Sequence, residues 1–170
     1  MITLHGTPIS NYYNKVKLAL IEKGIAFSEA PAGTPGVGIT DEAQFAASPL
    51  GKIPFIRVDG QALCESQVIV DYLEARWPTP PLVPADAFAA AKVRELATFV
   101  DLHIELVARE LYASAFFGGA PLDDAAKDAS ARSWSSTSPA SSSWRALHPT
   151  PRGTASRSPT ARPGPACRWW

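Results

Sequence analysis

The sequence predicts an α/β domain followed by an all-helical segment. Three observations support this fold class: a strand–helix–strand pattern before residue 28, a hairpin signal that leads into another helix, and a long apolar stripe of helical spacing beyond residue 86. The expected order over residues 1–77 is β-α-β-α-β-β-α. A strand–helix–strand unit of this length connects parallel strands by a right-handed crossover.

The first strand is expected at residues 2–4, ahead of a break at residues 6–8. Ser10 and Asn11 are residue types that cap helices. Apolar positions at helical spacing follow them, namely Tyr12, Val16, Ala19, Leu20 and the stem of Lys23. A second strand is expected at residues 25–27, a Gly- and Pro-rich segment at residues 30–40 and a short helix at residues 41–47.

The next elements surround a strong turn signal. Residues 55–58 and 62–63 flank Asp59-Gly60, a pair typical of two-residue hairpins. Ser66 is expected to cap a helix whose inward positions are Ile69, Tyr72, Leu73 and the stem of Arg76. This helix should end at Trp77, because the residue before a proline avoids helical conformation.

A proline-rich linker is expected at residues 78–85, before a partial helical domain over residues 86–129. Asp86 begins a stripe made of Val93, Leu96, Ala97, Val100, Ile104, Val107 and Leu111, which predicts one long helix ending at Gly118-Gly119. Residues 130–170 contain six arginines and no acidic residue, so the formal net charge of zero conceals −6 before them and +6 within them. That composition predicts a disordered tail.

Several function classes find no support in the sequence. The neutral total charge gives no general attraction to nucleic acid or anionic membranes. No apolar run approaches the roughly 20 residues that cross a bilayer, and no secretion signal is expected at the start. The two cysteines, Cys64 and Cys167, lie far apart and form no metal-binding pattern. These observations favour a cytoplasmic protein without a metal site.

Ser10 stands where a helix begins after a strand. A thiolate placed there would receive a hydroxyl hydrogen bond and the positive end of the helix dipole, which lower the pKa of a thiol. The alternative is that Ser10 only caps the helix. The histidines His5 and His103, and the thiol of Cys64, are expected to have packing roles.

Two further pairs carry polar groups suited to a peptide ligand. If the Ile53-Pro54 bond is cis, the backbone N–H and C=O of Ile53 turn outward and can pair with an extended peptide. Glu65 can accept an amino group, while Ser66 and the nearby helix N–H groups can hold a carboxylate. Lys52 could reach an anionic ligand end. Each pair also has a plain structural reading, as a strand start, a capping pair or a solvated lysine.

Three segments of the sequence resemble the cytosolic bacterial glutathione transferases. Residues 7–20 are similar to the first strand–helix junction of that family, residues 48–54 to its "NPxGKVP" segment, and residues 59–73 to its "DG…L.ES.AI..YL" segment. The three motifs occur in order and at the family's spacing over residues 1–77.

The resemblance implies a thioredoxin-like N-terminal domain, a helical C-terminal domain and a homodimer. It implies that glutathione is the co-substrate and that Ser10 stabilises its thiolate, with Asn11 as an alternative donor. Ile53, beside Pro54, would pair with the cysteinyl part, and Glu65 and Ser66 would hold the γ-glutamyl end. Lys52 and Gln44 are further contacts that it suggests. The partner would be a small electrophile.

The family pattern stops near residue 130. Family members continue with several more helices, whereas residues 131–170 have almost no aliphatic residue beyond Leu147. The composition suggests a frameshifted reading of a GC-rich gene, or alternatively a basic disordered tail. The pocket for the electrophile would then be incomplete, which predicts weak turnover. A non-catalytic glutathione-binding or protein-interaction module, and a glutathione-dependent isomerase or dehalogenase, are the alternatives to a transferase.

Overall fold

The computed structural model describes residues 1–33, 42–129 and 131–132. The contacts divide the chain into two compact units, of which the first covers residues 1–84 and the second begins at Ala85. Within these described ranges no helix is long and apolar enough to cross a membrane. The tail beyond residue 132, and the expectation of disorder or a frameshift there, lie outside the described residues.

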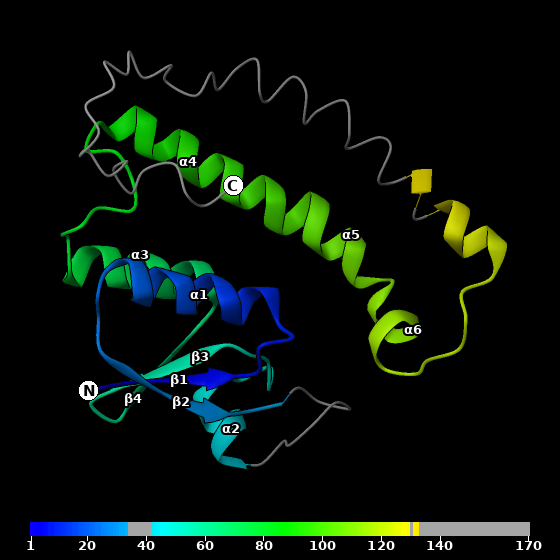
Figure 1. The fold of residues 1–170 in the computed structure, drawn as a ribbon, viewed down its shortest axis with the longest axis horizontal. Helices are drawn as coiled ribbons and strands as arrows, with labels where there is room; N and C mark the ends of the chain where they lie inside the picture. The colour runs from blue at the N-terminus through cyan, green and yellow to red at the C-terminus, as the bar shows by residue number, and fades with distance from the viewer. Residues whose placement is uncertain (34–41, 130, 133–170) are drawn as a thin grey trace, which may run out of the picture. The chain divides into compact units, whose positions relative to one another are not determined.

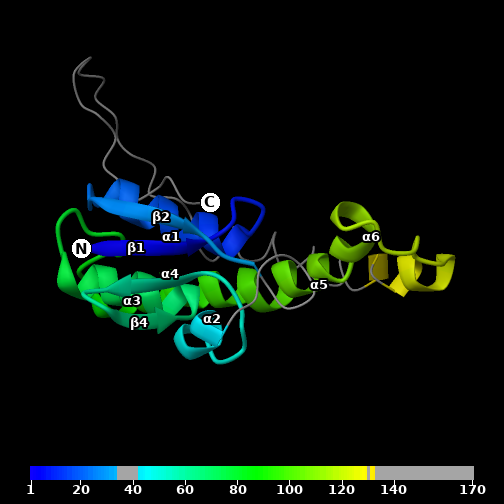
Figure 2. The ribbon, with the colours of Figure 1, turned by 90° about the horizontal axis from the view of Figure 1, so that it is seen from below.

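The first unit has the element order that the sequence predicts. Its elements are β1 (Ile2–Gly6), α1 (Asn11–Glu22), β2 (Phe27–Pro31), α2 (Glu42–Ala47), β3 (Phe55–Val58), β4 (Gln61–Cys64) and α3 (Ser66–Arg76). The strands form one sheet in the order β2-β1-β3-β4, in which β1 and β2 are parallel and the other pairs antiparallel. Helices α1 and α3 cover one face of the sheet and α2 lies on the other (Figure 1). Figure 2 shows the strands from the side of α2.

The main core lies between the sheet and helices α1 and α3. Successive side chains of a strand point to opposite faces, and β1 buries alternate residues, beginning with Ile2 and Leu4. The other members of this core are Tyr13, Val16, Ala19, Leu20, Ile56, Ile69 and Leu73. Burying a large apolar side chain contributes roughly 1.5–3 kcal/mol. This layer therefore stabilises the packing of α1 and α3 on the sheet.

Two expectations about the first crossover are wrong. The strand expected at residues 25–27 runs over Phe27–Pro31, because the N–H groups of Lys23, Gly24 and Ile25 bond back to carbonyls of α1 and delay the sheet ladder. The buried tyrosine of α1 is Tyr13, which is 2% exposed, and not Tyr12.

The predicted hairpin is confirmed. Asp59 and Gly60 both have positive φ, 49° and 87°, between β3 and β4. Positive φ at both central residues defines the type I′ turn, whose twist matches that of two antiparallel strands. The turn therefore sets the register of β4 against β3, and with it the place where α3 begins.

The residues expected to form a linker pack on the first unit. Leu82 contacts the main core, and Glu74 of α3 accepts the N–H of Leu82 at 3.0 Å. The buried Lys23 ammonium donates to the carbonyls of Trp77 at 2.7 Å and Pro80 at 3.0 Å. The linker is therefore tied to the ends of α1 and α3.

The second unit is helical, but its long helix is not uniform. It contains α4 (Ala87–Phe99), capped by the Asp86 carboxylate, then a π-helical segment (Val100–Glu105), α5 (Leu106–Arg109) and α6 (Tyr112–Phe116). The expected single helix up to Gly118 is wrong, because the chain turns after Arg109 and α6 is separate. Figure 1 shows α4 and α5 as one rod.

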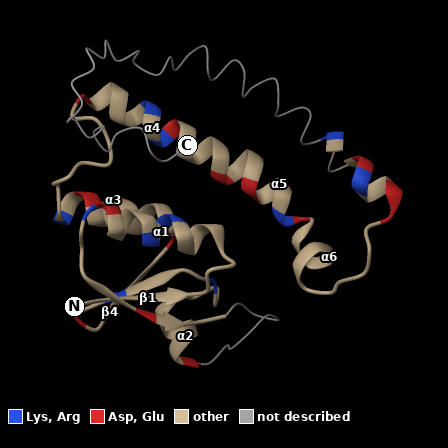
Figure 3. Ribbon diagram, viewed as in Figure 1, with Lys and Arg blue, Asp and Glu red and all other residues tan. Residues whose placement is uncertain are grey.

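Charged residues of both signs are interspersed in the described part of the chain. Helix α3 carries Asp71, Glu74 and Arg76, and α4 carries Lys92, Arg94 and Glu95, so both signs occur on each helix (Figure 3). This arrangement gives no broad basic face on those helices, and a basic face is the electrostatic feature of nucleic-acid-binding domains.

Candidate functional site

Three of the segments singled out from the sequence meet at one edge of the sheet. The strand register aligns His5 of β1 with Phe55 of β3, and Phe55 with Cys64 of β4. Because β3 begins at Phe55 and β4 ends at Cys64, the chain enters β3 and leaves β4 at this row, next to the end of β1. The β1–α1 loop, residues 52–54 and residues 65–66 therefore lie at the same edge, which is the candidate site.

Ser10 is the N-cap residue of α1. Its backbone is extended, with φ −85° and ψ 119°, and its Oγ accepts the Tyr13 N–H at 3.2 Å. A serine hydroxyl has one proton and two lone pairs, so the cap uses a lone pair and leaves the proton for another acceptor. Helix N-termini also favour anions. Capping the helix and donating to a thiolate are thus compatible roles.

The Ile53–Pro54 peptide bond is cis, as the sequence analysis anticipated. Pro54 is buried and Ile53 is half-buried. In the described part of the chain the Ile53 N–H and C=O make no backbone hydrogen bond, since the β3 ladder begins at Phe55. Lys52 is exposed, and its side chain makes no hydrogen bond or ion pair to the other candidates within the described ranges.

Gln44 positions the loop in front of Lys52. It is 5% exposed, and its Nε2 donates to the carbonyls of Gly33 at 2.5 Å and Gly51 at 2.7 Å. Both amide hydrogens are therefore engaged with backbone carbonyls. This role in linking β2 to the loop is one that the sequence did not indicate.

Glu65 takes the cap position of α3 that was expected of Ser66. Ser66 is the first helical residue and is buried, whereas Glu65 has φ 68° and ψ 110° and makes no side-chain cap bond. Its carboxylate is exposed and has no ion pair or hydrogen bond within the described residues. A non-glycine residue in such a backbone conformation costs about 1–3 kcal/mol, and such residues cluster at ligand sites.

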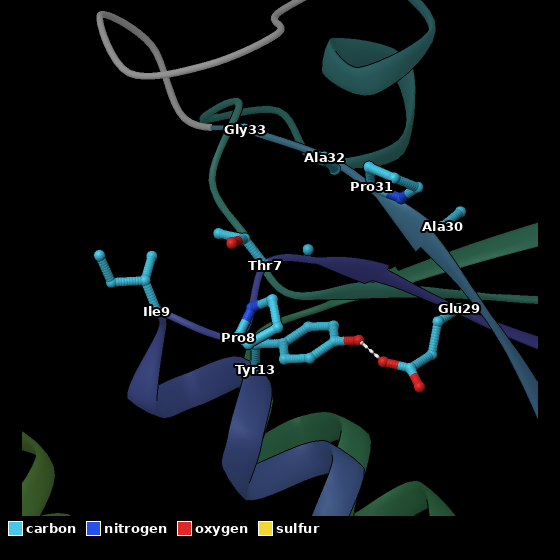
Figure 4. Close-up of a pocket in the computed structure, with 10 residues that line it drawn as sticks. Thr7, Pro8, Ile9, Tyr13, Glu29, Ala30, Pro31, Ala32 and Gly33 are labelled. Atoms are coloured by element: carbon cyan, nitrogen blue, oxygen red, sulfur yellow. Dashed lines mark hydrogen bonds between the residues drawn. The ribbon is translucent and has the colours of Figure 1, made fainter.

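A hollow of about 500 Å³ opens beside the loop that leads to Ser10 (Figure 4). It is lined by residues 6–9, Tyr13 and residues 29–33. The Tyr13 hydroxyl donates to Glu29, which also receives the Lys17 ammonium at 2.9 Å. Burial and the bond to Glu29 raise the pKa of Tyr13, and the bonds from Tyr13 and Lys17 lower the pKa of Glu29. Tyr13 therefore stays protonated in this wall.

The sequence analysis assigned packing roles to Cys64 and His103. Cys64 is a free thiol at the end of β4, and His103 is exposed on the π-helical segment. In the parts of the chain that are described, no group of three His, Cys, Asp or Glu side chains is placed to hold a metal ion.

The arrangement of the first unit defines its class. A four-stranded mixed sheet with α1 and α3 on one face, α2 on the other and a cis-proline before β3 is a thioredoxin-like domain. The family model of the glutathione S-transferase N-terminal domain matches residues 4–81. These residues are therefore similar to that domain family.

Known proteins extend this comparison. A glutathione S-transferase from Pseudomonas putida is 48% identical over 118 residues, which are 69% of this chain and 52% of the relative. A maleylacetoacetate isomerase from Pseudomonas aeruginosa is 34% identical over 94 residues, 52% of this chain and 44% of the relative. A holo structure of maleyl pyruvate isomerase, a bacterial glutathione S-transferase of the Zeta class, matches 90% of this chain and 71% of its own, with 26% identity and a TM-score of 0.69. The chain spans about half the length of the curated relatives it matches.

Proposed function

We propose that this chain is a glutathione transferase, which binds glutathione across the candidate site and directs its thiolate at an electrophilic carbon. The observation that carries the proposal is the row of His5, Phe55 and Cys64, because it gathers a helix start, an unpaired backbone segment and a free carboxylate at one edge. Those three features match the thiol, the peptide backbone and the amino group of glutathione.

Each candidate residue has a role set by its own chemistry. Ser10 donates its hydroxyl proton to the sulfur and so stabilises the thiolate without removing a proton. Ile53, next to Pro54, pairs through its backbone with the cysteinyl part of glutathione. Glu65 accepts the γ-glutamyl amino group and Ser66 donates to the neighbouring carboxylate. Lys52 supplies a charge for the glycine carboxylate.

The reaction is a substitution at carbon. The sulfur lone pair forms a carbon–sulfur bond while the carbon–halogen bond of an aryl halide breaks, and halide leaves with the electron pair. The hollow of Figure 4 favours an apolar, uncharged electrophile, since proline, alanine and isoleucine dominate its described lining and Glu29 is its one charge there.

Retention on immobilised glutathione and conjugation of a model aryl halide test the proposal. We expect the purified chain to be retained, to elute with free glutathione and to conjugate the halide slowly. Slow turnover is expected because the chain spans about half the length of its curated relatives. A chain that passes through the column and releases no halide would contradict the proposal.

A glutathione-dependent isomerase is the second candidate, favoured by the likeness to maleylacetoacetate isomerase. Its substrates would be diketo acids, and Glu29 disfavours a dianion in the hollow. Turnover of a cis-diketo acid exceeding that of the aryl halide would support the isomerase. Retention on glutathione without either activity would support a non-catalytic glutathione-binding module.

The proposal also includes a cytoplasmic homodimer. The free thiol of Cys64 suits a reducing compartment. Leu50 and Phe45 are 64% and 44% exposed, so the first unit presents apolar surface that a second copy could cover. Analytical ultracentrifugation measures whether the purified chain is a dimer.

Glu65→Gly should have opposite effects on stability and on binding. Glycine adopts a φ of 68° without the strain of a side chain, so the free energy of unfolding should rise by about 1 kcal/mol. Loss of the carboxylate should weaken glutathione binding about tenfold, as expected for a hydrogen-bonded charge. Urea unfolding and titration calorimetry measure the two effects.

Glu65→Gln is the matched control for that variant. It keeps the strained backbone and removes only the charge, so stability should stay near wild type while binding weakens. If Glu65→Gly binds glutathione as tightly as wild type, the assignment of the γ-glutamyl end to Glu65 is wrong.

A further inference from the structure

One half-buried titratable ring lies directly behind the candidate site. His5 is in register with Phe55, the residue that follows Ile53-Pro54, and the two rings stack with centroids 4.4 Å apart and planes 9° apart. Alternation along β1 turns Ile2 and Leu4 toward the main core, so His5 lies on the face that carries α2. The bond from Arg57 to the Ala43 carbonyl of α2, at 3.3 Å, locates this face.

One nitrogen of the His5 imidazole has no polar partner among the residues that the structure describes. Its Nε2 is buried and makes no hydrogen bond to any residue that the structure describes. Buried polar atoms almost always have partners, so this unpaired nitrogen is unusual. The stacking on Phe55 is the contact that holds the ring. A neutral ring tolerates this position better than a charged ring, which would carry an N–H donor at both nitrogens.

The surroundings oppose a positive charge on His5. On this face β3 contributes Arg57, β4 contributes the thiol of Cys64, and β2 contributes uncharged Ala30 and Ser28. Glu42 of α2 and Lys52 of the loop are exposed to solvent. Burial and the Arg57 charge lower the pKa of His5.

We propose that His5 is a positioning residue for glutathione binding: its neutral ring, stacked on Phe55, holds the start of β3, and protonation of the ring releases it. The backbone of Ile53 is two residues from Phe55, so loosening the stack moves the groups assigned to the cysteinyl part of the ligand. The inference rests on the proposed function, because that function assigns the Ile53 backbone to glutathione.

The test measures the affinity for S-methylglutathione between neutral pH and about pH 5.5. This probe has no titratable thiol, so ionisation of the sulfur beside Ser10 does not contribute. For the wild-type chain we expect the dissociation constant to rise about fivefold on acidification. His5→Phe keeps a stacking ring that does not titrate, so its affinity should match wild type at neutral pH and stay level.

Two further variants sharpen the result. His5→Ala should bind S-methylglutathione weakly at every pH. In turnover assays it should raise the KM for glutathione and leave kcat at saturating glutathione little changed. His103→Phe replaces an exposed histidine of the second unit and should keep the wild-type pH profile. The proposal would be overturned if His5→Phe lost as much affinity on acidification as wild type does.

Backbone amide signals separate this inference from the proposed function. If the wild-type chain fails to bind S-methylglutathione at neutral pH, the proposed function is wrong. The pH dependence of the backbone amide signals of Ile53 and Phe55 still tests the role of His5, because it needs no ligand. The inference is supported if they titrate with the His5 ring in wild type and stay constant in His5→Phe. Constant amide signals in wild type would overturn it.

Discussion

Lys23→Ala is expected to lower the free energy of unfolding of the first unit by about 3–5 kcal/mol. The Lys23 side chain is 0% exposed and is paired with Glu74, while its ammonium donates to the carbonyls of Trp77 and Pro80. Alanine would leave the Glu74 carboxylate, which is 17% exposed, without its counter-charge. Because a domain is stable by only about 5–15 kcal/mol, this loss is a large fraction of the total. Urea unfolding measures it.

A double-mutant cycle isolates the charge from the packing. Lys23→Met keeps the apolar stem and should still lose most of the stability, since Glu74 remains a poorly solvated, unpaired carboxylate. Adding Glu74→Gln removes that charge and keeps an oxygen for the N–H of Leu82, so much of the loss should return. A Lys23→Met variant within about 1 kcal/mol of wild type would show that the buried pair contributes little.

The order of elements in the first unit could be predicted because local signals agree with the fold. Asp59-Gly60 specifies a turn whose twist fits the strands, and Ser10 marks a helix start that its own hydroxyl caps. The boundary of the second strand was predicted wrongly because hydrogen bonds at the end of a helix decided it. The N–H groups at the end of α1 bond back to the helix, which moved the second strand to Phe27–Pro31.

The residues of the candidate site could be named from the sequence, but only the resemblance to a family implied that they converge. Ser10, Ile53 and Glu65 are far apart in the chain, and only the pairing of β3 with β1 and β4 brings their segments to one edge. The unusual backbone of Glu65 was also hidden, since glutamate has no preference for positive φ. The sequence predicted Ser66 as the cap because serine is the more common residue there.

Contacts of long sequence separation carried no local signal at all. The stem of Lys23 was expected to be buried from helical spacing, yet its ammonium bonds carbonyls 54 and 57 residues away. The stack of His5 on Phe55 depends on the register of two antiparallel strands.

The π-helical segment, Val100–Glu105, also had no signal in the sequence, because it lies within a stripe of unbroken helical spacing.

Ser10→Ala should raise the pKa of the glutathione thiol in the complex by about 1–2 units. A hydrogen bond to a charged group contributes about 1.5–3 kcal/mol, and one pKa unit corresponds to about 1.4 kcal/mol. For a thiol that is half ionised at pH 7 in the wild-type complex, the thiolate fraction would then fall by about five- to fiftyfold, and conjugation would fall with it. The ultraviolet absorbance of the thiolate, followed against pH in the saturated complex, measures the shift even where turnover is slow.

The helix cap must be separated from the thiolate contact, because the Ser10 Oγ also accepts the Tyr13 N–H. Ser10→Ala removes both bonds, and the lost cap alone costs about 1 kcal/mol of stability. Ser10→Asp restores the cap with a carboxylate that has no proton to donate and repels a neighbouring thiolate. Ser10→Asp should therefore have the free energy of unfolding of wild type, and the glutathione thiol in its complex should still have a raised pKa. If instead Asn11→Ala raises the thiol pKa while both Ser10 variants leave it unchanged, the donor is Asn11 and the role assigned to Ser10 reduces to capping α1.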